Sequence, residues 1–338
     1  MKTLILFAAA SVLCAQTPPA LSNAHLETRA FSGDLDSQLR GSSPAWFGYQ
    51  VKTVHKDENC CWSDSNRGCY LEGDSGHRIE IHSDRPVQLE GSDAAAVLFR
   101  VANNHIEKVQ LFSMACPLDA GGLPFVWLTG VPAEASLTEL HKLADSNETE
   151  RLVDSSVFAI AQHDQPEADN ILNQLAAPDK PEKVREKVSF WLGASRGAAG
   201  VKTLRQMLKN DPSTSVRDKV VFALSIGKQP EGIETLIEAA KSDPSPHVRS
   251  QAIFWLAQKA GKQAQAAIVN AIQNDPDTEV KKKAVFALSQ LPKDDGVPKL
   301  IEVARTQRNP EVRKQAFFWL GQSGDPRALA FIEQVLSK

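Results

Sequence analysis

The sequence predicts a two-domain α+β chain, in which a small β-rich N-terminal domain precedes an all-α array of about six helical hairpins. Two observations predict this division. A nine-residue motif recurs every 32 residues through the C-terminal half, and every cysteine after position 14 lies in the N-terminal half. We place the two domains at residues 24–145 and 146–338, after a leader of residues 1–15 and a linker of residues 16–23.

The first residues have the pattern of an export signal. A lysine at position 2 precedes an apolar segment from Leu4 to Leu13, which is too short to span a bilayer and is typical of a secretory signal peptide. We expect cleavage after Ala15 and a periplasmic or secreted mature protein. Lipid anchoring at Cys14 is disfavoured, because Leu13 stands where a small residue is needed. No later run has the apolar length of a membrane helix, so we expect no membrane span.

Composition narrows the class of partner. The 338-residue chain is 42% hydrophobic and 23% charged, as is typical of a soluble globular protein. Its formal net charge is −3 at pH 7, and this acidic balance argues against a general binder of nucleic acids or anionic membranes. We therefore expect no nucleic-acid partner.

The cysteines outside the leader are Cys60, Cys61, Cys69 and Cys116. An even number in an oxidising compartment predicts two disulfides, with three possible connectivities. Because a bridge between adjacent residues would be strained, we expect each member of the adjacent pair to bond with one of the other two. The alternative is a zinc site completed by His55 or His77. It is disfavoured, since the spacing matches no common zinc pattern and thiolates rarely stay reduced outside the cytoplasm.

Between the linker and the array, short apolar runs alternate with Gly, Pro, Asp and Asn, which predicts strands. Candidate strands are residues 46–54, 78–82, 86–89, 96–101, 107–112 and 124–128, with a hairpin turn at 102–105 and a helix at 136–144. The polar residues here are His55, Asp57, His77, Asp84, His105 and Asp119. They form no recognisable catalytic motif. We interpret Asp119 to Gly122 as a tight turn that holds Cys116 in register.

The repeated motif begins with valine at positions 184, 216, 248, 280 and 312, and a weaker copy begins at Leu152. Self-similarity at a fixed period in this range is typical of stacked helical hairpins. The motif forms the first helix of each hairpin. A second helix follows it, with apolar residues at helical spacing, as at Val201, Leu204 and Leu208. Neither helix can bury its apolar stripe alone, so stacking must complete the core.

This pattern resembles HEAT repeats, in particular the short subclass named for its occurrence in phycobilisome lyases. The resemblance rests on an aspartate five residues before the valine, on Val-Arg, on a small residue at the fifth place and on leucine at the ninth. It implies an armadillo-like, right-handed solenoid whose motif helices line a concave side. It also implies a ladder in which each motif arginine joins the aspartate at the next turn. The ladder candidates are Asp179, Arg185, Asp211, Arg217, Asp243, Arg249, Asp275 and Arg313.

One motif position points away from the buried stripe. The residue six beyond the valine lies about 200° around the helix from it, and this residue is phenylalanine in every copy. We predict that these rings face the groove, near several lysines; the alternative is that each ring packs under the next repeat. The groove candidates are Phe158, Phe190, Phe222, Phe254, Phe286 and Phe318, with Lys187, Lys219, Lys283 and Lys314. The next residue alternates between alanine and tryptophan, which indicates a duplicated two-repeat unit whose tryptophans fill the space that alanines leave.

A groove of aromatic rings rimmed by cations and amides suits a protein or peptide partner. We therefore expect an extracytoplasmic scaffold or adaptor without enzymatic activity, cofactor or metal. One alternative is a polysaccharide or cell-wall binder, because aromatic rings also stack on sugars. Another is an unrecognised hydrolytic site in the N-terminal domain.

The resemblance raises two enzymes, and the sequence disfavours both. Bilin lyases share the repeat but act in the cytoplasm, which the signal peptide contradicts. Deoxyhypusine hydroxylase builds a di-iron site from adjacent His-Glu pairs. The array has only His163 and His247, and neither is followed by glutamate.

Overall fold

The computed structural model describes residues 16–57, 60, 67–73, 78–80, 92–146, 148–259 and 261–337. The chain divides into two compact units: Met1–Leu143 with Glu148–Ala159, and Ala144–Asn147 with Ile160–Lys338. We call them the N-terminal unit and the helical unit and describe each by itself. The predicted leader lies outside the described residues, as do Cys61, His77, Asp84 and the expected strand at 86–89.

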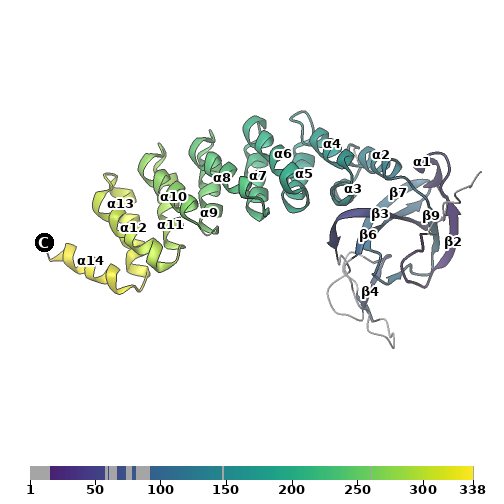
Figure 1. Ribbon diagram of the computed structural model, residues 1–338, viewed down its shortest axis with the longest axis horizontal. Coiled ribbons are helices and arrows are strands. Elements are labelled where there is room, and N and C mark those ends of the chain that lie inside the picture. Colours follow the sequence, from purple (N-terminus) through teal and green to yellow (C-terminus); the bar gives the residue numbers. More distant parts are fainter. Residues whose placement is uncertain are drawn as a thin grey trace, which may run out of the picture. The chain divides into compact units, whose positions relative to one another are not determined.

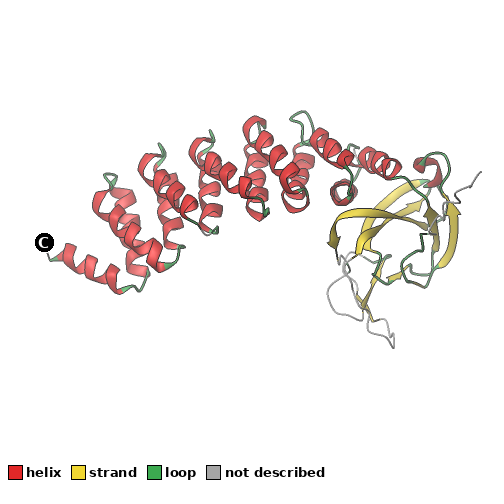
Figure 2. Cartoon of the chain, viewed as in Figure 1, coloured by secondary structure: helices red, strands yellow, loops and turns green. Residues whose placement is uncertain are grey.

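The N-terminal unit is β-rich, as predicted, and its strands form two sheets (Figure 2). The larger sheet has the order β2 (His25–Ala30), β9 (Pro124–Thr129), β3 (Ala45–Asp57), β6 (Ser92–Ala102) and β7 (His105–Ser113). The smaller has the order β1 (Leu21–Ser22), β8 (Leu118–Asp119), β4 (Arg67–Tyr70) and β5 (Arg78–Glu80). Helices α1 (Leu35–Gln38) and α2 (Ala133–Ala144) belong to the same part of the chain. The expected hairpin is β6–β7, and its turn places Asn103 and Asn104 at positive φ, which asparagine tolerates.

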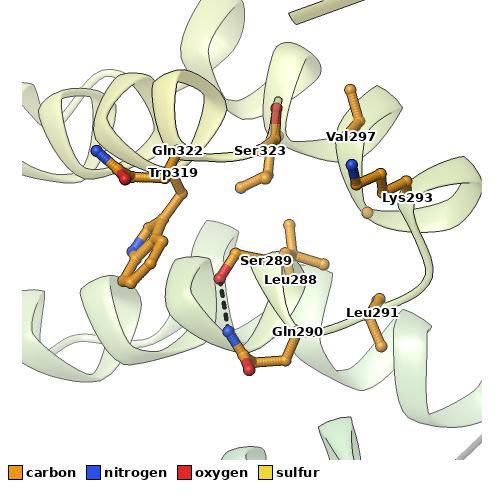
Figure 3. Close-up of a pocket in the computed structure, with 11 residues that line it drawn as sticks. Leu288, Ser289, Gln290, Leu291, Lys293, Val297, Trp319, Gln322 and Ser323 are labelled. Carbon is orange, nitrogen blue, oxygen red and sulfur yellow. Dashed lines mark hydrogen bonds between the residues drawn. The ribbon is translucent and has the colours of Figure 1, made fainter. Parts of the chain in front are cut away.

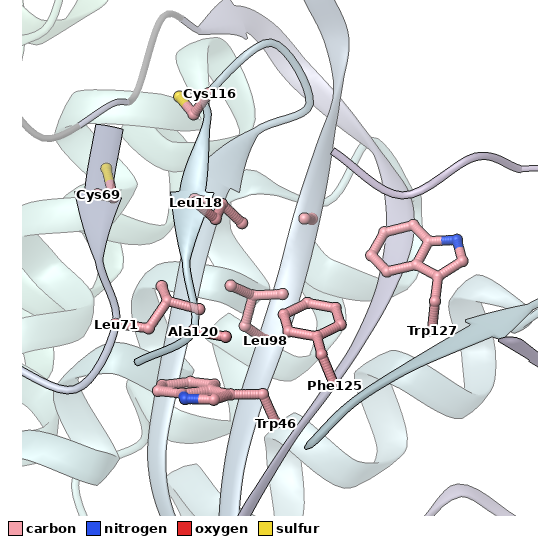
Figure 4. Packing of buried hydrophobic residues seen from close by; sticks show 10 residues of the cluster. Trp46, Cys69, Leu71, Leu98, Cys116, Leu118, Ala120, Phe125 and Trp127 are labelled. Atoms are coloured by element: carbon pink, nitrogen blue, oxygen red, sulfur yellow. The ribbon is translucent and has the colours of Figure 1, made fainter. Parts of the chain in front are cut away.

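Side chains from both sheets form one buried cluster. Trp46 and Phe125 from the larger sheet meet Leu118 and Cys116 from the smaller sheet and its approach (Figure 4). The buried indole of Trp46 donates to Glu72 Oε1 at 2.7 Å, so its polar group is satisfied. These contacts explain how short strands hold a stable core.

A disulfide joins Cys60 to Cys116, which is one of the pairings the sequence left open. Cys69 is disulfide-bonded as well. Next to this cluster, Asp119 holds a turn. Its Oδ1 accepts from the Gly121 amide at 2.8 Å, and its Oδ2 accepts from Asn23 Nδ2 at 2.6 Å. Gly121 has a φ of 64°, which favours glycine. Both oxygens of the Asp119 carboxylate therefore accept hydrogen bonds that hold this part of the fold together.

The rest of the chain alternates motif helices with connecting helices, which follow one another in sequence order through the helical unit (Figure 1). The motif helices are α3 (Glu150–Gln162), α5 (Glu182–Ser195), α7 (Thr214–Ile226), α9 (Pro246–Ala257), α11 (Thr278–Ser289) and α13 (Pro310–Gln322). The connecting helices are α4 (Pro166–Leu175), α6 (Gly197–Asn210), α8 (Pro230–Ser242), α10 (Lys262–Asn274), α12 (Lys293–Thr306) and α14 (Pro326–Leu336). This confirms the predicted helical solenoid. Among the described helices, none has the length and apolarity needed to cross a membrane.

The motif helices bury the stripe that the period predicts. In α7, Val216, Val220 and Leu224 are buried, and the same three positions are buried in α9 and α11. N-capping side chains fix where these helices start. Ser213 caps α7 by accepting a hydrogen bond from the Val216 amide, and Asp277 caps α11. Each helix therefore presents one apolar side to its neighbours and frees the opposite side.

Three buried ion pairs join successive motif repeats. Arg185 donates through Nε and Nη2 to both carboxylate oxygens of Asp211, at 2.7 and 3.1 Å. Arg217 reaches Asp243 in the same way at 2.9 and 3.2 Å. All six side chains of the ladder are buried, the third pair being Arg249 with Asp275. The hydrogen bond to Asp275 raises the pKa of the Arg249 guanidinium above its ordinary value.

Each ladder residue also holds its own turn. The Nη1 of Arg217 donates to the Asp211 carbonyl at 2.9 Å, and Oδ1 of Asp211 accepts from the Ser213 amide at 2.9 Å. Burying an ion pair is costly unless its remaining hydrogen-bonding groups are satisfied. These additional bonds meet that condition, so the ladder fixes both the turn and the offset between repeats.

Two of the ladder candidates stand outside it. Asp179 is exposed, because residue 153 of the preceding copy, where its arginine would stand, is valine. Within the described part of the chain, Arg313 bonds to the carbonyls of Gln307 and Arg308 through Nη1, and no carboxylate receives it. The junction between α11 and α13 has neither ladder residue, since Lys281 and Gln307 occupy the two positions.

The ladder generates a prediction about stability. Arg217→Met leaves the Asp243 carboxylate buried without its partner, so the free energy of unfolding should fall by about 3–5 kcal/mol. Arg313→Met removes the same side chain where no carboxylate receives it, and should cost about 1 kcal/mol or less. Urea denaturation of both variants measures the difference. Equal losses would show that the carboxylate bridge contributes nothing beyond the carbonyl bonds.

Candidate functional site

The phenylalanines of the helical unit alternate in exposure. We define the aromatic face as Phe190, Phe222, Phe254, Phe286 and Phe318 with Trp191, Trp255 and Trp319. The side chains of Phe190, Phe254 and Phe318 are 36%, 37% and 53% exposed. Phe222 and Phe286 are half-buried. The predicted positions therefore form one row, in which every second ring is open to solvent.

Tryptophan causes this alternation. Trp255 lies between two rings, with its centroid 5.1 Å from that of Phe222 in the preceding repeat and 5.0 Å from that of Phe254 in its own. Trp319 repeats the arrangement with Phe286 and Phe318, at 5.1 and 5.0 Å. Each indole thus covers the phenylalanine of the repeat before it. The sequence predicts that the tryptophans fill space that the alanines leave. In the structure Trp255 and Trp319 contact phenylalanine rings, and Ala223 and Ala287 are fully buried.

The row of ring contacts is broken at one place. Phe190 stacks on Phe222 with centroids 6.3 Å apart, whereas no ring contact in the described chain joins Phe254 to Phe286. A cavity of about 550 Å³ opens between these two rings. Its lining from α9 is Pro246, His247, Ser250, Gln251 and Phe254, and from α11 with its N-cap it is Asp277, Glu279, Val280, Lys283 and Phe286.

One residue position distinguishes this junction from the junction between α5 and α7. In α5 the position is Gly193, where an added β-carbon would lie 2.3 Å from the Ala223 carbonyl oxygen of α7. Those two helix backbones therefore approach closely, and their phenylalanines meet. The corresponding residue of α9, 64 positions later, is Ala257. Its β-carbon prevents the same approach by α11, so the two phenylalanines stand apart.

The cavity lining carries two carboxylates, Asp277 and Glu279, and one lysine, Lys283, and both carboxylates already have partners. The carboxylate of Asp277 is used in capping α11, where it accepts from the Glu279 and Val280 amides at 2.8 and 3.1 Å. Glu279 pairs with Lys282 at 2.9 Å, and this hydrogen bond raises the pKa of the Lys282 ammonium. Lys283 is exposed, and it has no ion pair with any described residue. The cavity therefore combines two aromatic walls with one cation available to a ligand.

The other predicted cations follow the same row. Lys187, Lys219 and Lys283 lie three residues before their phenylalanines, on the same side of the helix. Lys219 is exposed like Lys283, and Lys314 is exposed on α13. Gln251 and Gln315 occupy the corresponding positions in α9 and α13.

The remaining predicted phenylalanine is Phe158. It lies on α3 within the N-terminal unit and is half-buried. There it lines a separate cavity of about 420 Å³ with residues of β7.

A further cavity of about 240 Å³ lies at the C-terminal ends of α11 and α13. Trp319, Gln322 and Ser323 line one side of it, and Leu288 and Ser289 lie opposite (Figure 3). The buried Nε1 of Trp319 has no hydrogen-bond partner within the described chain. The start of α12 completes the lining of this cavity. The pattern of a single helix does not predict such a cavity, because the cavity forms where the ends of three helices meet.

Among the described residues, no group of three or more His, Cys, Asp or Glu side chains could hold a metal ion. His163, at the end of α3, is fully buried. His247 lies with its Nε2 3.4 Å from Asp218 Oδ1.

The family comparison agrees with this architecture. The family model described as HEAT repeats matches residues 168–257, 233–316 and 265–338, which together span half of the chain. The chain therefore belongs to the HEAT-repeat family. Among curated proteins, no sequence matches it.

Solved structures with a similar arrangement include human deoxyhypusine hydroxylase in complex with glycerol, at 18% identity over 60% of this chain and 89% of that one, with a TM-score of 0.27. Escherichia coli YibA has 21% identity over 61% of this chain and 77% of its own, with a TM-score of 0.37. The CpcE–CpcF complex of phycocyanin lyase from Nostoc has 20% identity over 46% of this chain and 99% of that one, with a TM-score of 0.34. At these values the likeness carries no argument about function.

The alternation of the row predicts unequal costs of truncation. Phe222→Ala removes a ring packed between Phe190 and Trp255, so it should destabilise the protein by about 2–3 kcal/mol, somewhat less than a fully buried phenylalanine. Phe318→Ala, at the more exposed end, should cost about 1 kcal/mol or less. Thermal or urea unfolding measures both, with Leu224→Ala as the buried control at about 2–5 kcal/mol. Equal losses at Phe222 and Phe318 would contradict the alternation.

Proposed function

We propose that this protein is a non-catalytic, extracytoplasmic adaptor whose aromatic face binds a polypeptide segment of a partner. The observation that carries the proposal is the cavity between α9 and α11. Phe254 and Phe286 form its walls, and Lys283 offers a cation with no ion pair in the described chain. An apolar side chain of the partner enters between the rings, and a neighbouring carboxylate reaches the lysine.

The physical properties of the site support a binding role. Its volume of about 550 Å³ falls in the range of small ligand pockets and accommodates one large side chain with part of its backbone. Partly exposed aromatic rings in the middle of a surface are where binding energy concentrates. Stacked repeats also create the extended surfaces on which partner chains bind. No step of this role requires a catalytic group.

Two features support the location. The apolar leader has the pattern of an export signal, and the Cys60–Cys116 disulfide is typical of oxidising compartments. Neither feature bears on the identity of the partner.

The proposal predicts that peptides selected on this protein depend on the cavity. A phage-displayed peptide library is selected on the purified protein, and the affinity of synthetic copies is measured by fluorescence anisotropy. Phe254→Ala and Lys283→Glu should each weaken binding at least about tenfold, which is about 1.4 kcal/mol, while the melting temperature of Phe254→Ala stays near that of the parent.

Lys241→Glu is the matched control, because Lys241 is an exposed lysine that lines a different cavity, between α8 and α10. It makes the same change in charge and should leave the affinity unchanged. Selected peptides that bind the Phe254 and Lys283 variants as tightly as the parent would refute the proposed site.

A further inference from the structure

The aromatic face repeats every two motif helices rather than every one. The exposed rings Phe190, Phe254 and Phe318 belong to α5, α9 and α13. The helices between them, α7 and α11, present half-buried rings, and each carries an exposed lysine three residues earlier, Lys219 or Lys283. Exposed rings therefore alternate with exposed lysines at this position from one motif helix to the next, and Lys314 of α13, one position earlier, lies outside the alternation.

The amides strengthen this alternation. The position three residues before the exposed ring is Gln251 in α9 and Gln315 in α13, so these helices carry no cation there. In α5 the position is Lys187, which already has an interaction partner. Lys219 and Lys283 have no ion pair with any described residue. Among the residues three positions before the phenylalanines, these two are therefore the cations available to a ligand.

Helix packing sets the spacing of this pattern. Neighbouring packed helices lie about 8–10 Å apart, so an aromatic ring is followed by a lysine after about 8–10 Å and by the next exposed ring after about 16–20 Å. A bound chain must place apolar and acidic side chains on one side at this spacing.

Only one regular backbone conformation meets both requirements. A polyproline II helix has three residues per turn and rises 3.1 Å per residue, so residues i, i+3 and i+6 share one side at intervals of about 9 Å. In a β-strand, residues i and i+3 point to opposite sides. In an α-helix, 9 Å corresponds to about six residues, which lie about 240° apart around the axis.

We infer that the segment bound by this face adopts the polyproline II conformation and alternates apolar and acidic side chains at every third residue. The inference rests on the proposed function and specifies its partner. Apolar residues at i and i+6 contact successive exposed rings, and an acidic residue at i+3 pairs with the intervening lysine. Aromatic surfaces suit this backbone, since it is preformed and loses little entropy on binding.

Two synthetic peptides of identical composition test the register. One is three copies of Leu-Pro-Pro-Glu-Pro-Pro, and the other is three copies of Leu-Pro-Pro-Pro-Glu-Pro, which moves each glutamate by one residue and about 120°. Isothermal titration calorimetry with the full-length protein should give an affinity at least about tenfold higher for the first peptide. Equal affinities would overturn the inferred register.

A charge exchange gives a second, independent readout. The variant with both Lys219→Glu and Lys283→Glu should lose the preference for the first peptide, and should instead bind three copies of Leu-Pro-Pro-Lys-Pro-Pro. Both substitutions lie at exposed positions, and circular dichroism checks that the variant stays folded. Failure of the lysine peptide to bind the folded variant would overturn the pairing of acidic residues with these lysines.

The outcomes separate this inference from the proposed function. If library-selected peptides require Phe254 but neither designed peptide binds, the face binds polypeptide and the polyproline II inference is wrong. If the selected peptides bind equally well without Phe254 and Lys283, both the proposed function and the polyproline II inference are wrong.

Discussion

The arginine–aspartate ladder is the interaction that holds the central junctions of the helical unit, from α5 to α11. Two-pronged hydrogen bonds from one repeat to the next, as between Arg217 and Asp243, leave little freedom in the offset between motif helices. The guanidinium also binds the carbonyl of its own turn, so one side chain orients both the helix and its neighbour. A buried charge that satisfies all these groups favours one geometry strongly, because any other leaves an ion without partners.

A fixed offset gives the surface side chains their pattern. Trp255 covers Phe222 at the α7–α9 junction, which the ladder spans, and Trp319 covers Phe286 at the α11–α13 junction, where Lys281 and Gln307 replace the ladder residues. The ring distance is 5.1 Å at both junctions. Small differences in the distance between neighbouring motif-helix backbones then decide whether a cavity forms between them. Gly193 allows α5 and α7 to meet closely, while Ala257 keeps α9 and α11 apart and leaves the cavity. The cavity thus depends on the difference between a hydrogen atom and a methyl group at a helix contact.

Much of this architecture could be predicted from the sequence, because the 32-residue period assigns each residue a place. The valine, the fifth and the ninth positions are buried, and the phenylalanine position turns away from them. The alternation in exposure could not be predicted, since a helical wheel treats one helix alone and omits the tryptophan that arrives from the next repeat. The resemblance to HEAT repeats places Asp179 and Arg313 in the ladder by motif position alone, whereas the preceding copy has Val153 at the arginine position and Arg313 bonds to carbonyls of its own turn. The pairing of strands in the N-terminal unit depends on contacts far apart in the chain, such as β3 with β9, which local patterns do not encode.

Photo-crosslinking tests whether a partner chain binds on the side of the helical unit that carries Phe254 and Phe286. Benzoylphenylalanine is placed at position 251, which lines the cavity, and separately at position 238, which is exposed on the connecting helix α8. Each protein is irradiated with a library-selected peptide. If the partner binds between Phe254 and Phe286, a covalent adduct forms from position 251 and none forms from position 238. Adducts from position 238 alone would place the partner on the connecting helices and contradict this binding site.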